Sequence, residues 1–310
     1  MVIKLNDAMG NEAYHIPVLL QEAINGLKID PDGVYVDVTF GGGGHSAEIL
    51  KCLDQGRLLA FDQDPDALKN VPEHSGLTFI PQNFRYMRNY LKMHRAVPAD
   101  GILADLGVSS HQFDEGERGF SIRTDAPLDM RMNPSVGKSV TELLQQAEEE
   151  KLAEIFKVWG EIRPAKALAR SIVESREYEA IETTGQLKAI AEKFAPRFKE
   201  HKFFAQVFQA LRIEVNEEMS VLKDFLEQSV EVLKPGGRLV VISYHSLEDR
   251  LVKNFMRSGK FSGEVEQDFF GNQIRPFKPL PGQPIVPNEE EIKRNPRSRS
   301  AKMRIAERLA

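Results

Sequence analysis

Four consecutive glycines and one aspartate form the most informative chemical pattern in the chain. The loop Gly41–Gly44 lies between an apolar run at residues 34–40 and a helix expected at residues 45–53. Glycines at such a position let a ligand approach the backbone, and the helix that follows offers free N–H groups. Asp62 ends a second apolar run, at residues 57–62, where a carboxylate can accept hydrogen bonds from both hydroxyls of a ribose. The loop and Asp62 together predict a site for a nucleotide-like cofactor.

This pattern fits a nicotinamide dinucleotide and S-adenosylmethionine (SAM) equally well, and three further features favour SAM. The turn and strand at residues 234–241 resemble the fifth-strand region of class I methyltransferases. Asp105 closes a fourth apolar run, where those enzymes place contacts to cofactor and substrate. No hydride-transfer group of His with Arg is evident in a second domain. A nicotinamide-dependent oxidoreductase stays open as the alternative.

Apolar runs and helical stretches alternate over the first third of the chain. This alternation predicts an α/β fold, in which a parallel sheet carries helices on both faces. Asp64 and Pro65 mark a helix start, with the aspartate as N-cap and the proline at the first helical position. The runs expected as strands are residues 34–40, 57–62, 77–81 and 100–105, and the helices expected between them are residues 45–53 and 86–94.

The pattern changes after residue 110 and returns to sheet-like runs after about residue 215. Residues 140–204 are almost wholly helical in pattern, which predicts an inserted helical domain. We therefore expect a flexible tail at 1–13, a SAM-binding domain formed by 14–110 and 215–310, and a helical substrate-recognition domain at 111–214. The later elements expected are a helix at 217–233 ended by residues 234–237, a strand at 238–244, a helix at 247–256, a surface loop at 259–287 and a strand at 300–308.

The composition is that of a soluble globular protein. The 310 residues carry a net charge of −5, and 41% of them are hydrophobic. Apolar runs fall short of the roughly 18 residues that a membrane span needs, and the N-terminus lacks the apolar segment of a signal peptide. A single cysteine, Cys52, excludes an intramolecular disulfide and a cysteine-based zinc site. We expect a cytoplasmic protein without a membrane partner and without a metal.

A basic segment near the end of the chain departs from this acidic average. Residues 293–308 hold seven basic residues and one acid, Glu307. Such a segment can bind phosphate while the whole chain stays acidic. Arg297 and Arg299 lie among few apolar residues and are therefore the candidate contacts to RNA phosphates. A solvated charged tail is the alternative.

Seven short motifs occur in one order from about residue 14 to residue 308. Together they closely resemble the RsmH (MraW) family of small-subunit ribosomal RNA cytosine-N4-methyltransferases. Each motif alone is short, but seven in order are highly specific. They are His15-Ile-Pro-Val-Leu19, Thr39-Phe-Gly-Gly-Gly-Gly-His-Ser46, Asp105-Leu-Gly-Val-Ser-Ser110, Glu117-Arg-Gly-Phe-Ser121, Leu128-Asp-Met-Arg-Met132, His245-Ser-Leu-Glu-Asp-Arg250 and Asn295-Pro-Arg-Ser-Arg-Ser300.

The resemblance implies a class I SAM-dependent methyltransferase fold, Rossmann-like, with an inserted helical domain. It implies methyl transfer to N4 of cytidine 1402 in 16S rRNA of the small ribosomal subunit. It places Phe84 near the adenine of SAM, and Asp105 and Gln112 near its methionine end. Trp159 and Cys52 are expected in the core, and a homodimer is one of the oligomeric states that stay open. The cofactor contacts carried over by motif are Gly43, Gly44, His45, Asp62, Phe84, Asp105 and Gln112.

Methyl transfer of this kind needs no metal, because the sulfonium of SAM makes its methyl group electrophilic. The amino lone pair of cytosine is delocalised into the ring, so N4 becomes a nucleophile only as it pyramidalises, which a nearby acceptor of its N–H groups favours. Asp105 either holds the amino group of SAM or accepts an N4 proton, with Tyr244 and His245 as further candidate catalytic residues. The base must also leave its stack to be reached. A non-catalytic RNA-binding assembly protein that keeps the SAM fold stays open.

Overall fold

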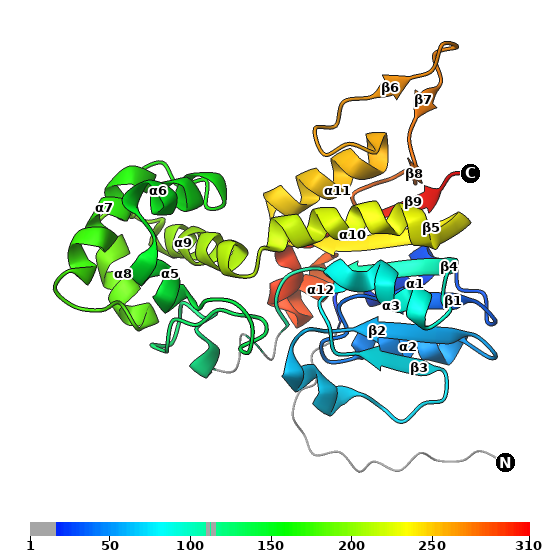
Figure 1. The fold of residues 1–310 in the computed structure, drawn as a ribbon, viewed down its shortest axis with the longest axis horizontal. Helices are drawn as coiled ribbons and strands as arrows, with labels where there is room; N and C mark the ends of the chain where they lie inside the picture. Colours follow the sequence, from blue (N-terminus) through cyan, green and yellow to red (C-terminus); the bar gives the residue numbers. More distant parts are fainter. Residues whose placement is uncertain (1–16, 110–111, 113–115) are drawn as a thin grey trace.

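A computed structural model describes residues 17–109, 112 and 116–310 of the chain (Figure 1). The tail predicted at residues 1–13, the first two residues of the His15 motif and Ser110 lie outside the described residues. Within the described part, the main sheet is made of β1 (Val34–Asp37), β2 (Arg57–Phe61), β3 (Leu77–Ile80), β4 (Ala99–Asp105), β5 (Leu233–Ser243), β8 (Phe277–Pro279) and β9 (Lys302–Arg308).

The strand order in the sheet is β3-β2-β1-β4-β5-β9-β8. The strands from β3 to β5 pair in parallel, and β9 runs antiparallel to both β5 and β8. Parallel strands end at the same side of a sheet, so β1, β2, β4 and β5 bring their carboxyl ends to one edge, which we call the carboxyl edge. The prediction of an α/β fold with a largely parallel sheet is confirmed.

The two faces of the sheet carry separate apolar cores, because side chains alternate along each strand. Val36 and Leu59 belong to the core on one face, and Tyr35 and Leu58 belong to the core on the other. The first face is covered by α3 (Met87–Met93), α10 (Glu218–Val232) and α11 (Ser246–Ser258), and the second by α1 (Leu20–Leu27) and α2 (Gly44–Cys52). Continuous apolar runs rather than alternating ones are typical of strands buried on both faces.

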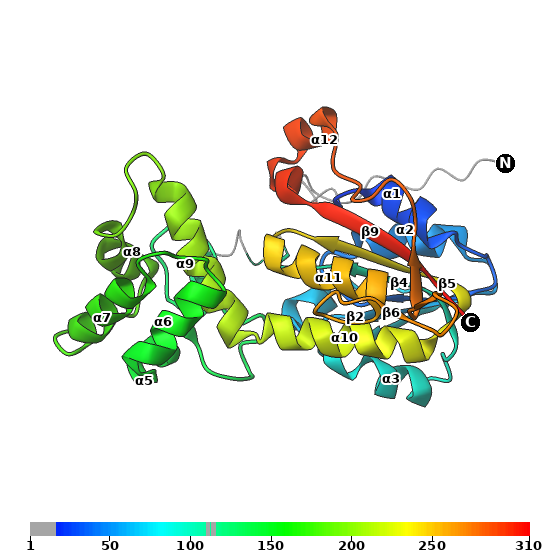
Figure 2. The ribbon, with the colours of Figure 1, turned by 90° about the horizontal axis from the view of Figure 1, so that it is seen from above.

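Helices fill the long connection between β4 and β5. Their core is separate from the sheet and includes Phe156, Leu168 and Leu211. Figures 1 and 2 show this group beside the sheet, joined to it through the step from α9 into α10. After η3 (Gly116–Arg118), the helices are α5 (Val140–Gln146), α6 (Glu149–Val158), α7 (Ala165–Arg176), α8 (Thr184–Glu192) and α9 (Glu200–Val215).

Some local predictions need correction. Residues 234–237 were expected to form a turn before the strand, but β5 already begins at Leu233, and its pairing with β4 shifts register there. Residues 65–70 form a 3₁₀ helix, η1 (Pro65–Asn70), although Asp64 caps it as predicted by accepting from Asp66 N. The loop expected at 259–287 contains the hairpin β6 (Glu266–Gln267) and β7 (Gln273–Ile274) as well as β8.

Cys52 is exposed, so the prediction of a buried residue is wrong. It is the last residue of α2, beyond the stretch whose buried positions end at Leu50. Trp159 packs at the border of the helical core rather than inside it, and its indole Nε1 donates a 2.8 Å hydrogen bond to Glu214. Among the described residues, no helix has the length and apolar character needed to cross a membrane.

Candidate active site

The glycine loop takes a conformation that requires glycine at one position and leaves an open side at another. Gly43 has φ of 78°, and a Cβ there would stand 2.8 Å from the ring of Phe40. At Gly42, no atom of the described residues lies within 4 Å of the place that a Cβ would occupy. The helix α2 begins directly after Gly43, and within the described part of the chain it receives no side-chain hydrogen bond at its N-cap. The loop therefore presents open backbone beside a helix N-terminus.

Asp62 lies directly after β2 and supports this loop. Its Oδ2 accepts a 2.7 Å hydrogen bond from Gly41 N, and its Oδ1 accepts one of 2.8 Å from Asp64 N. Burial raises the pKa of Asp62 to about 6, although both backbone hydrogen bonds act in the opposite direction. A carboxylate held in this way can accept further hydrogen bonds through its remaining lone pairs.

Asp105 joins three elements at the carboxyl edge. Its Oδ1 accepts a 2.7 Å hydrogen bond from the hydroxyl of Tyr244, directly after β5, and its Oδ2 lies 3.8 Å from Nδ1 of His45, in α2. Burial raises the pKa of Asp105 to about 6, while His45 and then the Tyr244 hydrogen bond lower it. The pKa of Tyr244 lies well above 10, first through burial and then through Asp105, so this hydroxyl stays a donor.

Most of the sequence-predicted cofactor residues gather around the glycine loop after β1, where Asp62, His45 and Asp105 lie. Gln112 lies beside the same loop, because its partner Asp64 donates to Asp62 and its partner Ser109 lies next to Gly41. Its Nε2 donates a 2.6 Å hydrogen bond to Asp64, and its Oε1 accepts one from Ser109 N. Gln112 is thus placed beside the η1 turn. Phe84 is half-buried in η2 (Phe84–Tyr86), with its ring 5.5 Å from that of Phe225 in an edge-on arrangement.

Asp37 and Thr39, which were not predicted as site residues, form hydrogen bonds that support the site. Asp37 is buried at the end of β1, where Ser46 Oγ donates to it at 2.7 Å and Thr39 N at 3.0 Å. Thr39 in turn accepts a 2.7 Å hydrogen bond from Asp105 N. An acid inside an apolar run was the available signal for Asp37, because a buried carboxylate must have hydrogen-bond donors around it.

Arg118 connects the segment after β4 to the cofactor side of the site. Its guanidinium lies 3.1 Å from Oδ2 of Asp64 and 3.3 Å from Asp66, and it also donates to the carbonyls of Arg131 and Met132. The side chains of Arg118 and Asp64 are only 13% and 5% exposed. The sequence motif that contains Arg118 does not reveal its partner, because Asp64 lies 54 residues away in the chain.

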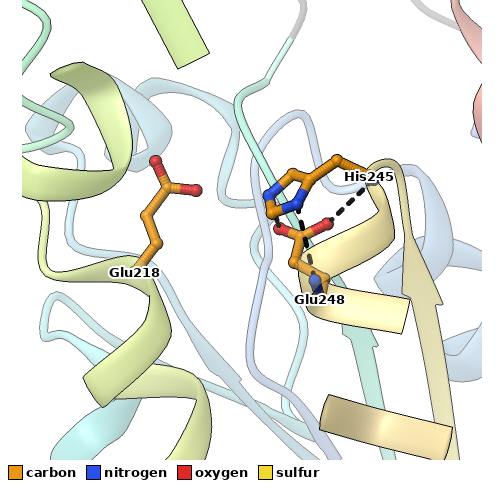
Figure 3. A group of neighbouring side chains, drawn as sticks. All are labelled: Glu218, His245 and Glu248. Atoms are coloured by element: carbon orange, nitrogen blue, oxygen red, sulfur yellow. Dashed lines mark hydrogen bonds and ion pairs between the residues drawn. The ribbon is translucent and has the colours of Figure 1, made fainter. Parts of the chain in front are cut away.

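A second charged group lies beside the site, at the starts of α10 and α11. Glu218, His245 and Glu248 each offer one ligand atom, all within 4.8 Å of one another (Figure 3). Two carboxylates and an imidazole suit several divalent metals. Arg212, however, already donates to both carboxylate oxygens of Glu218. This cation compensates part of the negative charge that a metal would need, so we assign no metal to the group.

The two arginines expected to bind RNA are exposed on η4 (Pro296–Ser300), which follows α12 (Glu289–Arg294). Ser298 between them is fully buried and donates through Oγ to Asn295 O at 2.7 Å. The basic segment is not a uniform arm, because Arg304 lies in β9 and pairs with Asp249 at 2.7 Å. The solvated-tail alternative is therefore wrong for the part of the segment that forms β9.

The strand order, the antiparallel β9 and the carboxylates after β2 and at the end of β4 define a class I methyltransferase type of α/β fold. The model of the MraW methylase family matches residues 12–309, and the chain belongs to this family. It is 56% identical over 297 residues to a ribosomal RNA small subunit methyltransferase H of Cytophaga hutchinsonii, covering 95% of this chain and 99% of that protein.

Two further comparisons also cover nearly the whole of this chain. A ribosomal RNA small subunit methyltransferase H of Parabacteroides distasonis is 54% identical over 301 residues, covering 96% of this chain and 99% of that protein. Among solved structures, the chain is similar to a putative rRNA-methylase from Clostridium thermocellum, with 13% identity, a TM-score of 0.45, and 95% of this chain and 100% of that chain covered.

Proposed function

We propose that this chain is a cytoplasmic, SAM-dependent methyltransferase that methylates N4 of cytidine 1402 in 16S rRNA of the small ribosomal subunit. The observation that carries the proposal is membership of the MraW methylase family over nearly the whole chain, with the names of the relatives at more than 50% identity in support. The carboxyl edge supplies a matching site, because it gathers a glycine loop, Asp62 and Asp105.

The residues at this edge fit SAM. The open backbone at Gly42 leaves room for a ligand beside the N-terminus of α2. Asp62 would accept hydrogen bonds from the ribose, and Gly43, Gly44 and His45 would lie along the cofactor. Asp105 would hold the positively charged methionine end, and Phe84 would contact the adenine. When bound, SAM supplies an electrophilic methyl group. Gln112 would act indirectly, through its hydrogen bond to Asp64.

The chain must then hold the target amino group and receive its proton. Asp105 is held by the Tyr244 hydroxyl and lies beside His45, so its carboxylate is fixed in direction. A fixed acceptor near N4 lowers the barrier because it needs no reorganisation as charge develops. We assign the first role of Asp105 to the cofactor, and we assign proton acceptance to Asp105 together with the groups around Tyr244 and His245.

The RNA would be bound by surfaces outside this edge. Arg297 and Arg299 are exposed and can contact phosphates, and residues 111–214 would form the substrate-recognition domain. The cytosine would be unstacked and reach the carboxyl edge from the side of the helical segment, because Asp105 leads directly into the connection that carries those helices.

Mass spectrometry of rRNA tests the proposal directly. Small subunits that lack the N4 methyl group on cytidine 1402 are incubated with SAM and the purified protein. The nucleosides and the RNA fragment that spans position 1402 are then analysed. We expect one added methyl group, on N4 of that cytidine. Binding of NAD in place of SAM in a thermal-shift screen would support the oxidoreductase alternative. SAM and subunit binding without methyl transfer would support the non-catalytic assembly protein.

A further inference from the structure

Arg212 connects the helical segment to the candidate active site. It lies in the last turn of α9, next to Leu211 of the helical core. Its Nε donates to Oε1 of Glu218 at 2.7 Å, and its Nη2 donates to Oε2 at 2.9 Å. The two side chains are 15% and 8% exposed. A buried pair with two parallel hydrogen bonds is strong and fixes geometry, so the end of α9 is held against the first turn of α10.

The joint between α9 and α10 is also fixed by the side chain of Asn216. Asn216 Nδ2 donates to Met130 O and Arg212 O, at 2.7 and 2.9 Å, and Asn216 Oδ1 accepts from Met132 N at 2.7 Å. Glu217 has φ of 51°, a left-handed conformation that is unfavourable for a residue with a Cβ. The hydrogen bonds of Asn216, next to this strained residue, hold the two helices in one relative direction.

On the side of the sheet, Glu248 fixes the backbone at the start of α11. Its Oε2 accepts hydrogen bonds from the backbone of Tyr244, at 3.0 Å, and of His245, at 3.4 Å. The His245 side chain accepts from Glu248 N, which completes a capping box at the start of α11. Glu248 thus fixes the backbone from which the Tyr244 side chain reaches Asp105.

The charge of Arg212 acts beyond its direct partner. Burial raises the pKa of Glu248, but His245 and then Arg212 lower it, and the resulting pKa lies below the ordinary value. His245 Nε2 is buried and makes no hydrogen bond to any residue that the structure describes, although it lies 3.1 Å from Glu248 Oε1. The Arg212 cation therefore favours the ionised form of Glu248, which accepts hydrogen bonds from the backbone.

On the basis of the proposed methyltransferase function, we propose that Arg212 is a positioning residue for methyl transfer. It holds Glu218 at the start of α10, and this carboxylate lies within 4.8 Å of the nearest ligand atoms of His245 and Glu248 at the start of α11. Glu248 in turn sets the backbone of Tyr244 so that its hydroxyl meets Asp105. The helical segment thus contributes to the geometry of the carboxyl edge through one guanidinium group. None of these residues needs to touch SAM for this effect.

The experiment compares Arg212→Met with the double variant Arg212→Met/Glu218→Gln. The single variant leaves Glu218 buried without a partner, which threatens folding, whereas the double variant removes both charges. We expect turnover at saturating SAM and RNA to fall about 10- to 100-fold in both variants, because the groups around Tyr244 and His245 that share proton acceptance are misplaced. SAM affinity should fall as well, because the Tyr244 hydroxyl orients Asp105. Amide exchange in residues 244–250 should become faster. Arg88→Met removes a more exposed ion pair to Glu231, also on α10, and should change none of these quantities.

A double-mutant cycle identifies the route. If Arg212 acts through Glu248, then combining Arg212→Met with Glu248→Gln should lower turnover no further than Glu248→Gln alone. If the folded double variant Arg212→Met/Glu218→Gln keeps wild-type turnover, or wild-type amide exchange in residues 244–250, the proposal is overturned. Additive losses in the cycle would overturn the route through Glu248. A wild-type protein without methyl transfer would instead refute the proposed function, and the exchange measurement would still report whether Arg212 orders the start of α11.

Discussion

The Tyr244 hydroxyl donates a 2.7 Å hydrogen bond to Asp105, and this bond joins the ends of β4 and β5. The two strands pair in parallel up to Asp105 and Ile242, so the bond links a residue of this last pair to Tyr244, two residues beyond Ile242. It fixes one carboxylate oxygen and leaves the other 3.8 Å from His45. The direction of the Asp105 carboxylate is therefore determined from two sides, as a group that must bind or react in one geometry requires.

The role of Asp105 can be separated by Asp105→Asn, which keeps size while removing charge. If Asp105 mainly binds SAM, affinity should fall about 10- to 150-fold, as for a lost charge-assisted hydrogen bond, with near-normal turnover at saturating SAM. We expect this result. If Asp105 is instead the acceptor of the N4 proton, affinity should hold and turnover should fall by roughly 100-fold or more. Calorimetry and single-turnover methylation distinguish the two, and a variant normal in both measurements would remove Asp105 from the site.

Asp62→Ala should weaken SAM binding about 10- to 150-fold, because a charge-assisted acceptor for the ribose is lost. The variant also removes acceptors for Gly41 N and Asp64 N, so thermal unfolding must be measured beside calorimetry. Asp62→Asn keeps one acceptor oxygen and should lie between the two proteins. Asp54→Ala changes an exposed acid near the opposite end of the sheet and serves as the control. Wild-type affinity in a folded Asp62→Ala protein would contradict the assignment.

SAM affinity should rise with pH between about 5 and 7. Burial raises the pKa of Asp62 and of Asp105 to about 6 in the free protein, and the ionised forms bind the cofactor better. Each carboxylate that must be ionised lowers affinity by about tenfold for each pH unit below its pKa. Calorimetry across this range should show the slope, and Asp62→Asn should remove part of it. A flat profile would mean that neither carboxylate titrates with binding.

Asp62 and Asp105 give the stability of the SAM-free protein the opposite dependence on pH. Their folded-state pKa lies above the unfolded value of 3.8, so the folded protein binds more protons than the unfolded chain between about pH 4 and 6. Their contribution to stability is present below pH 4 and is lost as the pH rises through 6. Thermal unfolding of wild type and Asp62→Asn without SAM should show a smaller loss in the variant over this window.

Changing Arg297 and Arg299 together to Ala should weaken RNA binding and leave SAM binding unchanged. Each lost contact to single-stranded phosphate should reduce the slope of log affinity against log salt by about 0.7. The double change Lys51→Ala/Lys92→Ala, on exposed lysines of α2 and α3, provides a control of equal charge. An unchanged salt slope would show that the two arginines do not contact RNA phosphates.

The sequence predicted those parts of the site that depend on position along single strands. Asp62 and Asp105 were found because apolar runs ended at them, and parallel strands end at one edge. Arg212 and Glu248 were missed because their relationship arises only when α9, α10 and α11 meet. Gln112 was assigned through a motif, yet its partner Asp64 is 48 residues away and could not be read from local pattern. Cys52 was misplaced because residue type alone does not show where a helix leaves the core.

The helices between β4 and β5 also affect how the chain reaches its fold. β4 ends at Asp105 and β5 begins at Leu233, yet the two strands form a central pairing of the sheet. Joining the ends of a flexible loop costs entropy that grows with the logarithm of its length. If the helical segment folds first around its own core, the ends of the connection are already close together, and the entropy cost of pairing β4 with β5 is smaller. Leu168→Ala, at a fully buried position of this core, should therefore slow the formation of a distant sheet.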